Sequence, residues 1–281
     1  MKKKANASKV YFVDLRADSN RSVLDKMRKA LKQANLLKVT AEGDLVAVKL
    51  HFGEKDSTAY LRTPYVRAVV ELLAENGRAP FLTDTNTLYV GTRSNSVRHI
   101  ATAVENGFSY ASTGVPVIIA DGLKGGQYES VEIDGKHFKE VKIAADIARA
   151  DSMVVLTHVK GHELTGIGGA LKNLGMGGGS RAGKLAMHSD VRPSISAEKC
   201  SGCGKCMQWC QVKAITIKNK KAVIDTGICV GCAECILVCP KGAPRVEWNW
   251  SGPRVQEKMV EYAAGVAATK KRGIGYVNFV M

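Results

Sequence analysis

Two cysteine runs decide the fold of the C-terminal part of the chain: CSGCGKCMQWC from Cys200 to Cys210, and CVGCAECILVCP from Cys229 to Pro240. Both runs have the spacing C-x2-C-x2-C-x3-C. All 8 cysteines of the chain lie in these two runs. The rest of the chain therefore has no thiol for a disulfide or for nucleophilic catalysis.

This spacing, used twice, is typical of bacterial proteins with two [4Fe–4S] clusters, in which the fourth cysteine of each run binds the other cluster. The predicted ligand sets are Cys200, Cys203, Cys206 and Cys239 for the first cluster, and Cys229, Cys232, Cys235 and Cys210 for the second. A pair of zinc sites is the alternative, because C-x2-C pairs also suit tetrahedral zinc. Cysteine triplets followed by a fourth cysteine, found twice, favour the clusters.

The segment between the runs is compatible with a small ferredoxin-like α+β module. Two short alternating strands are predicted at 214–218 and 221–225, joined at Asn219 and Lys220. Glycines within and before the runs (Gly202, Gly204, Gly227 and Gly231) allow backbone amides to approach sulfur closely. The first run has Gln211 where the second has Pro240, and we expect this to alter the surroundings of one cluster.

Elsewhere, apolar runs of strand length alternate with helical patterns, which favours an α/β fold with a mostly parallel sheet and helices on both faces. We predict strands at 9–15, 45–50, 80–83, 116–120, 152–157 and 273–280, helices at 19–37, 63–76, 93–106 and 143–149, and a hairpin at 127–139 that turns at Asp134-Gly135.

The α/β pattern resumes after the cysteine runs, with a predicted helix at 254–271 and a strand at 274–280. We therefore expect a discontinuous α/β domain, residues 1–192 and 249–281, with a two-cluster ferredoxin module inserted at 193–248. Because the chain stops in or just after a strand, we expect this domain to be incomplete at its C-terminal end.

Polar residues follow four of the predicted strands, where open α/β sheets bind their ligands. They are His51, Gly53, Glu54 and Lys55 after the first, Asp84, Thr85 and Asn86 after the next, Asp121 after the third, and His158, Lys160, His162 and Glu163 after the last. Four polar strand ends on one edge predict a shared site.

The stretch from Gly161 to Arg181 is rich in glycine, which lets backbone amides converge on an anion at the start of a short helix at 169–174. It matches neither a Walker A loop nor G-x-G-x-x-G, so it does not indicate nucleotide binding. Lys172, Arg181 and Lys184 supply positive charge, so phosphate or carboxylate is the expected ligand class. The alternative at this edge is a second, non-cluster metal held by His51, His158, His162 and His188.

We assign candidate roles on this basis. The candidate catalytic residues are His51, Glu54, His158, Lys160, His162 and Lys172. The candidate ligand-binding residues are Asp84, Asn86, Asn173, Gly175, Gly177, Arg181 and Lys184.

The chain has 281 residues, of which 45% are hydrophobic, and a formal net charge of +15. Two thiolate-bound clusters would remove about four positive charges, which leaves a basic protein suited to an acidic redox partner protein or an anionic ligand. The positive charges are dispersed, which disfavours nucleic acid. Neither a long apolar stretch nor a secretory signal is visible, so we expect a cytoplasmic protein without a membrane partner.

Four motifs, HFGE at 51–54, TDTNTLY at 83–89, HVKGHE at 158–163 and GGALKNLGMG at 168–177, precede the cysteine runs. In this order they resemble the DUF362 family of iron–sulfur proteins. The resemblance covers nearly the whole chain and implies a ferredoxin module inserted in an α/β domain, with no settled reaction. Relatives commonly have a cysteine at the position of Gly178 and continue beyond Met281, so any role of that cysteine is in doubt here.

The histidines and the GGALK stretch are also similar, more distantly, to the nickel-cofactor domain of lactate racemase. In that domain a lysine anchors the cofactor, and the resemblance carries over only to Lys172.

The leading hypothesis is an iron–sulfur oxidoreductase or electron-transfer protein that delivers electrons to a small anionic ligand or cofactor at the strand ends. One alternative is a non-redox enzyme, racemase-like or group-transferring, whose clusters are structural. Another is an electron-relay subunit of a larger redox complex.

Overall fold

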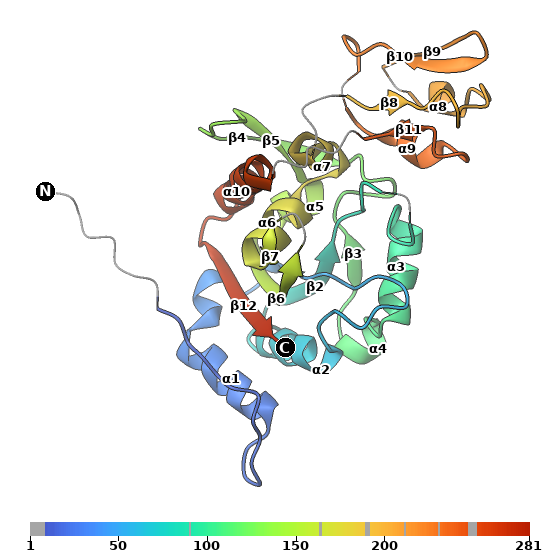
Figure 1. Ribbon diagram of the computed structural model, residues 1–281. Coiled ribbons are helices and arrows are strands. Elements are labelled where there is room, and N and C mark those ends of the chain that lie inside the picture. Colours follow the sequence, from blue (N-terminus) through green and yellow to red (C-terminus); the bar gives the residue numbers. More distant parts are fainter. Residues whose placement is uncertain are drawn as a thin grey trace, which may run out of the picture.

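A parallel β-sheet forms the centre of the computed structural model, which describes residues 9–89, 91–162, 165–188, 192–210, 212–229, 231–246 and 252–281 (Figure 1). The strand order is β12-β6-β1-β2-β3, and every neighbouring pair in it is parallel. The strands are β1 (Leu45–Lys49), β2 (Ala79–Asp84), β3 (Val117–Ile119), β6 (Ser152–His162) and β12 (Ile274–Val280). A short strand, β7 (Gly166–Gly168), folds back antiparallel on β6.

The direction of strand addition reverses between β1 and β6. The chain adds β2 and then β3 on one side of β1, and later adds β6 and β12 on the other side. In open α/β sheets such a reversal leaves a crevice at the carboxyl ends of the two central strands. The ends of β1 and β6 are therefore where a ligand site is expected.

Alternate residues of the central strands feed two separate hydrophobic cores, one on each face of the sheet. Val46 and Val48 of β1 face one core, whereas Ala47 faces the other. The first core is closed by α1 (Val23–Gln33), α2 (Thr63–Ala74) and α3 (Ser96–Glu105). The second is closed by α5 (Ala145–Arg149), α6 (Ala170–Gly178), α10 (Gly252–Ala268) and the hairpin of β4 (Tyr128–Glu132) with β5 (Glu140–Ala144).

The remaining helices connect these parts. A 3-10 turn η1 (Leu36–Val39) follows α1, α4 (Tyr110–Thr113) precedes β3, and α7 (Arg181–His188) follows α6 directly. Helix starts are set by ordinary capping: the Ser22 side chain accepts from the Asp25 amide, and the Asn95 side chain accepts from the Arg98 amide.

Residues 192–246, called here the cysteine segment, lie together at one end of the molecule beyond α7 (Figure 1). They form two small antiparallel pairs, β8 (Ser194–Ile195) with β11 (Pro244–Arg245), and β9 (Ile215–Lys218) with β10 (Lys221–Ile224). Two short helices, α8 (Lys205–Gln208) and α9 (Glu234–Val238), contain the third cysteine of each triplet, Cys206 and Cys235. Asn219 and Lys220 both have positive φ, as a two-residue hairpin turn requires.

The mixed α/β class and the mostly parallel sheet confirm the prediction from sequence. Most differences are at element ends. Helix 19–37 ends early because Asn35 adopts a left-handed conformation, and Ile143 and Ala144 belong to β5 rather than to the following helix. β6 extends to His162 because β7 pairs with its end. Among the described residues, no helix is long and apolar enough to cross a membrane.

The predicted strand at 9–15 was wrong. Its described residues pair with no other strand, and Val10 and Phe12 remain 88% and 87% exposed. The apolar pattern resembles that of the true strands, but a strand also needs hydrogen-bonding neighbours, which a local pattern does not reveal.

Gly175 lies where α6 crosses α10. A Cβ built at this position would lie 2.1 Å from the carbonyl oxygen of Met259. We predict that Gly175→Ala lowers the free energy of unfolding by roughly 2 kcal/mol, because overpacking outweighs the gain in helix propensity that alanine gives. Urea unfolding followed by circular dichroism measures the change.

The matched control is Gly126→Ala, since a Cβ at Gly126 meets no atom within 4 Å. Its stability should stay within about 0.5 kcal/mol of the native value. Equal stability of the two variants would show that the crossing of α6 and α10 is not tightly packed.

Candidate functional site

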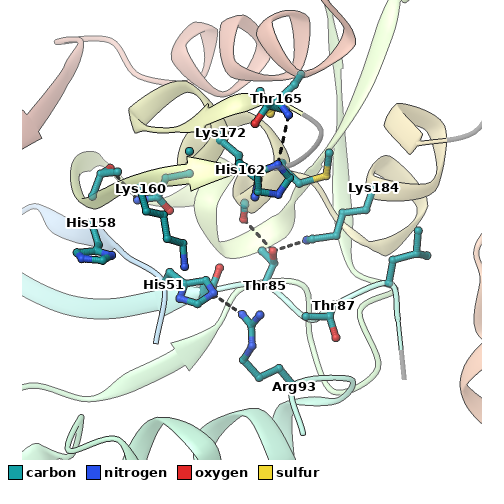
Figure 2. Close-up of a pocket in the computed structure, with 18 of the residues that line it drawn as sticks. His51, Thr85, Thr87, Arg93, His158, Lys160, His162, Thr165, Lys172 and Lys184 are labelled. Carbon is teal, nitrogen blue, oxygen red and sulfur yellow. Dashed lines mark hydrogen bonds and ion pairs between the residues drawn. The ribbon is translucent and has the colours of Figure 1, made fainter. Parts of the chain in front are cut away.

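A cavity of about 460 Å³ opens at the carboxyl ends of β1, β2 and β6, on the edge where the strand order reverses (Figure 2). It brings together many residues that the sequence analysis selected: His51, Glu54, Asp84, Thr85, His158, Lys160, His162, Lys172, Asn173, Gly177, Lys184 and His188. Its wall also contains Lys49, Arg93 and Tyr89, which the sequence analysis did not select. Apolar side chains complete the wall, among them Leu88, Met176 and Met259.

A buried ion pair lies beneath the cavity. Lys49, at the end of β1, is 1% exposed, and its Nζ lies 2.9 Å from Oδ1 of Asp84 at the end of β2. The same Nζ donates to Oδ1 of Asn173 at 2.8 Å. Asn173 in turn donates to the Leu156 carbonyl at 2.9 Å and to Oγ1 of Thr157 at 3.0 Å. One hydrogen-bonded network therefore joins the ends of β1 and β2 and the middle of β6 to α6.

Gly177 makes room for this network. A Cβ at this position would lie 2.6 Å from the Lys49 Nζ, and the Gly177 carbonyl accepts a hydrogen bond from Oγ1 of Thr85 at 2.8 Å. The sequence analysis treated Gly177 as an anion-binding residue. The structure gives it a steric role next to Lys49.

Arg93 links the two carboxylates of the cavity, Glu54 and Asp84. Its guanidinium forms an ion pair with Glu54 and lies 3.4 Å from Oδ2 of Asp84. Burial alone would raise the pKa of Asp84, but Lys49, His99 and Arg93 hold it well below the ordinary range. Tyr89 donates to Glu54, and burial raises the pKa of Tyr89 to about 12, so its hydroxyl stays protonated. Both carboxylates of the cavity are therefore ionised and paired.

The cavity carries an excess of positive charge. Lys49, Arg93, Lys160, Lys172 and Lys184 line it, against the two carboxylates of Asp84 and Glu54. Burial lowers the pKa of Lys172 to about 8, with the charges of Lys160 and Arg93 acting in the same direction. Burial also lowers the pKa of Lys184, whose Nζ donates to the Gly179 carbonyl at 2.6 Å and to Thr85. This charge balance favours an anion in the cavity.

Three histidines of the cavity, His51, His158 and His188, are neutral at pH 7. Burial and the nearby Arg93 lower the pKa of His51 to about 3, and burial and Lys172 lower that of His188 to about 4. Burial also lowers the pKa of His158. Nδ1 of His51 accepts from the Gly53 amide at 3.0 Å, which leaves the proton on Nε2. Lys160 extends toward His51, and Nδ1 of His162 accepts from the Thr165 amide at 3.3 Å (Figure 2).

Several selected residues do not line the cavity. Asn86 donates from its backbone and side chain to Asp121, at 3.0 and 2.8 Å, so these two side chains are occupied with each other. Gly175 packs against α10, and Arg181 donates to backbone carbonyls behind the cavity wall. Glu163 and Gln211 lie outside the described residues.

The first cysteine set lines a small cavity of its own. Cys200, Cys203, Cys206 and Cys239 all contribute to its wall, together with Gly202 and Gly204. Backbone amides donate to sulfur, from Ala222 to Cys200 and from Ala243 to Cys239, both at 3.3 Å.

The second set is also gathered in space. Burial raises the pKa of Cys235 to about 12, and the neighbouring thiols of Cys232, Cys229, Cys206 and Cys210 raise it further. Cys210 also accepts a backbone hydrogen bond, from the Ala214 amide at 3.2 Å. No three His, Cys, Asp or Glu side chains of the described ranges converge closely enough to hold a single metal ion.

Leu88 connects the two sites. It lines the cavity at the strand ends, and it also belongs to the hydrophobic cluster that contains Cys206, Cys235 and Leu185. The sequence analysis did not select Leu88, since nothing in a single apolar residue after a predicted strand signals contact with a distant segment.

The chain matches the family described as Domain of unknown function (DUF362) over residues 46–281. No curated protein matches the chain. Since the match includes all the described strands of the sheet, the cavity and both cysteine runs, the chain belongs to the DUF362 family.

Proposed function

We propose that this protein is an iron–sulfur protein in which two [4Fe–4S] clusters, held by a ferredoxin-type module in the cysteine segment, serve redox chemistry on a small anionic ligand or cofactor in the cavity. The observation that carries the proposal is the position of Leu88. This side chain lines the cationic cavity and also belongs to the hydrophobic cluster of the cysteine segment.

The cysteines fit the clusters in their grouping and in their surroundings. Each of the irons in a cubane takes one thiolate, so the ligands of a cluster stand further apart than those of a single ion. The lining of one small cavity by Cys200, Cys203, Cys206 and Cys239 agrees with ligand exchange between the two runs. Hydrogen bonds from Ala214, Ala222 and Ala243 to sulfur are of the kind that tunes cluster potentials. When bound, the clusters supply one-electron chemistry.

The cavity supplies the groups that hold the ligand and handle its protons. Lys172 and Lys160 are the cations best placed to hold it, because no described carboxylate forms an ion pair with either of them, whereas Lys49 and Arg93 are already paired. Neutral His51 and His158 can donate or accept a proton without a large change in charge. The distant similarity to lactate racemase supports the same role for Lys172 as an anchor.

An acidic redox protein is the proposed partner. In the first cysteine set Cys203 is exposed, and Lys199, Lys205 and Lys220 next to it are exposed as well. Complementary charge of this kind steers association and is screened by salt.

Iron loading tests the proposal directly. After anaerobic reconstitution the native chain should contain about eight irons, and dithionite should produce the EPR spectrum of two interacting reduced clusters. Cys206→Ala should lose one cluster and hold about four irons, because it removes a ligand of the first set only. Metal analysis and EPR measure both.

Met207→Ala is the matched control, since Met207 neighbours Cys206 but offers no thiolate. It should keep the native iron content. A colourless native protein with bound zinc would contradict the proposal. An enzymatic activity that is the same with oxidised and reduced clusters would instead favour a non-redox enzyme with structural clusters.

The pH dependence of anion binding tests the cavity. Because the pKa of Lys172 is about 8, its charge is largely present at pH 7 and is lost as the pH rises through 8. Sulfate, which does not titrate in this range, should therefore bind progressively more weakly between pH 7 and 9. Lys172→Met should weaken sulfate binding at pH 7 about tenfold, equivalent to about 1.4 kcal/mol, and should flatten the pH profile. Isothermal titration calorimetry measures both.

Lys184 has a lowered pKa too, so a small residual pH dependence is expected in this variant. The control, Lys241→Met, removes an exposed lysine outside the cavity and should leave sulfate binding unchanged. Native affinity and an unchanged pH profile in Lys172→Met would show that this lysine does not hold the anion.

A further inference from the structure

Arg181 is a fully buried cation with an unusual set of partners. It is 0% exposed, and its guanidinium donates to the backbone carbonyls of Thr87, at 3.3 Å, and of Lys124 and Ser94. Among the described residues no carboxylate forms an ion pair with it. The closest candidate, Asp121, is engaged by the backbone and side chain of Asn86. The polar atoms that Arg181 contacts are thus all neutral carbonyl oxygens.

A buried charge without an ionic partner is costly, by several kcal/mol even after the protein relaxes around it. Three carbonyl dipoles offset part of this cost, but they do not neutralise the charge. Within the described chain Arg181 therefore has no carboxylate in direct contact, and Asp121 and Glu234 act on it only at longer range.

The second cysteine set lies next to Arg181. Leu185, one helical turn further along α7, contacts the loop between Cys229 and Cys232: a Cβ built at Gly231 would lie 3.4 Å from Cδ2 of Leu185. Lys124, whose carbonyl accepts from Arg181, places its Nζ 3.7 Å from Oε1 of Glu234 at the start of α9. Burial lowers the pKa of Arg181, and the charges that oppose this are Asp121, Glu234 and the Cys232 thiolate.

Among the described residues the first cysteine set has no fully buried cation of this kind, since Lys221, which donates to the Cys200 carbonyl at 2.7 Å, is only half-buried. Gly202, the counterpart of Gly231, packs against the cysteine segment itself, since its Cβ would lie 2.4 Å from the Lys220 carbonyl oxygen. Cys203, the counterpart of Cys232, is exposed, and the adjacent Lys205 is exposed too. Water and salt screen that lysine, whereas they reach a fully buried guanidinium much less.

We infer that Arg181 is the counter-charge of the cluster held by Cys229, Cys232, Cys235 and Cys210, and that it keeps the reduction potential of this cluster above the value that its buried surroundings would otherwise impose. The inference rests on the proposed function and deepens it. A [4Fe–4S] core on four thiolates carries net negative charge, which would add to the longer-range charges of Asp121 and Glu234 next to Arg181. Reduction adds one more negative charge, so burial opposes it and a neighbouring cation favours it.

A redox titration of the reconstituted full-length chain, followed by visible absorbance and EPR, tests the inference. Arg181→Gln can still donate to backbone carbonyls but has no charge, and it should shift one of the two potentials to a more negative value while the other stays unchanged. Arg181→Lys keeps the charge and should restore most of the native value. Lys205→Gln is the matched control for an exposed cation beside the other set, and its smaller shift should disappear at high salt.

Glu234→Gln provides a test that does not depend on the folding of an Arg181 variant. It removes a negative charge from the same surroundings, so it should shift the same potential in the opposite direction. The inference is overturned if Arg181→Gln binds both clusters and leaves both potentials unchanged, or if Glu234→Gln moves neither. A native chain that binds no iron would instead overturn the proposed function, so the two failures are distinguishable.

Discussion

The buried ion pair between Lys49 and Asp84 is the interaction on which the cavity depends. Each residue ends a strand, the two strands are neighbours in the sheet, and Asn173 of α6 ties the same lysine to the middle of β6. Removing charges from water in this way is costly, and hydrophobic side chains of the same size would often be at least as stable. The ion pair therefore matters more for holding these side chains in place than for the stability of the fold. It joins β1, β2 and β6 around one point. Gly177 can lie this close to Lys49 because it has no side chain.

This arrangement also determines which charges are left for a ligand. Asp84 is shared by Lys49 and Arg93, and Glu54 is held by Arg93 and Tyr89, so both carboxylates of the cavity are already occupied. The positive charge that faces the cavity space then comes chiefly from Lys160 and Lys172. Because His51, His158 and His188 are neutral, they add no charge to the cavity at pH 7, and Lys172 loses its charge as the pH rises through about 8.

Local patterns predicted the fold class well because the central strands are buried on both faces and the helices have one apolar face. They failed at 9–15, where an equally apolar run has no neighbouring strand.

For the site, strand ends led to His51, Asp84 and His158 because parallel strands bring their carboxyl ends together. Lys49 was missed because it lies within a buried strand, and Arg93 was missed because it precedes a helix. Arg181 was selected for its charge, but nothing local shows that its side chain points away from the cavity.

The two cysteine runs show a second limit of prediction from local sequence patterns. Their spacing is identical, so a sequence argument treats the two halves as equivalent. The chain enters the cysteine segment after α7 and leaves it before α10, and both helices pack around the same core. Leu185 of α7 lies against Gly231 of the second run, whereas Cys203 of the first run is exposed. A symmetric motif placed at one edge of an asymmetric fold acquires two different environments, and it is the place of the cysteine segment in the chain, rather than the motif, that makes the two runs differ.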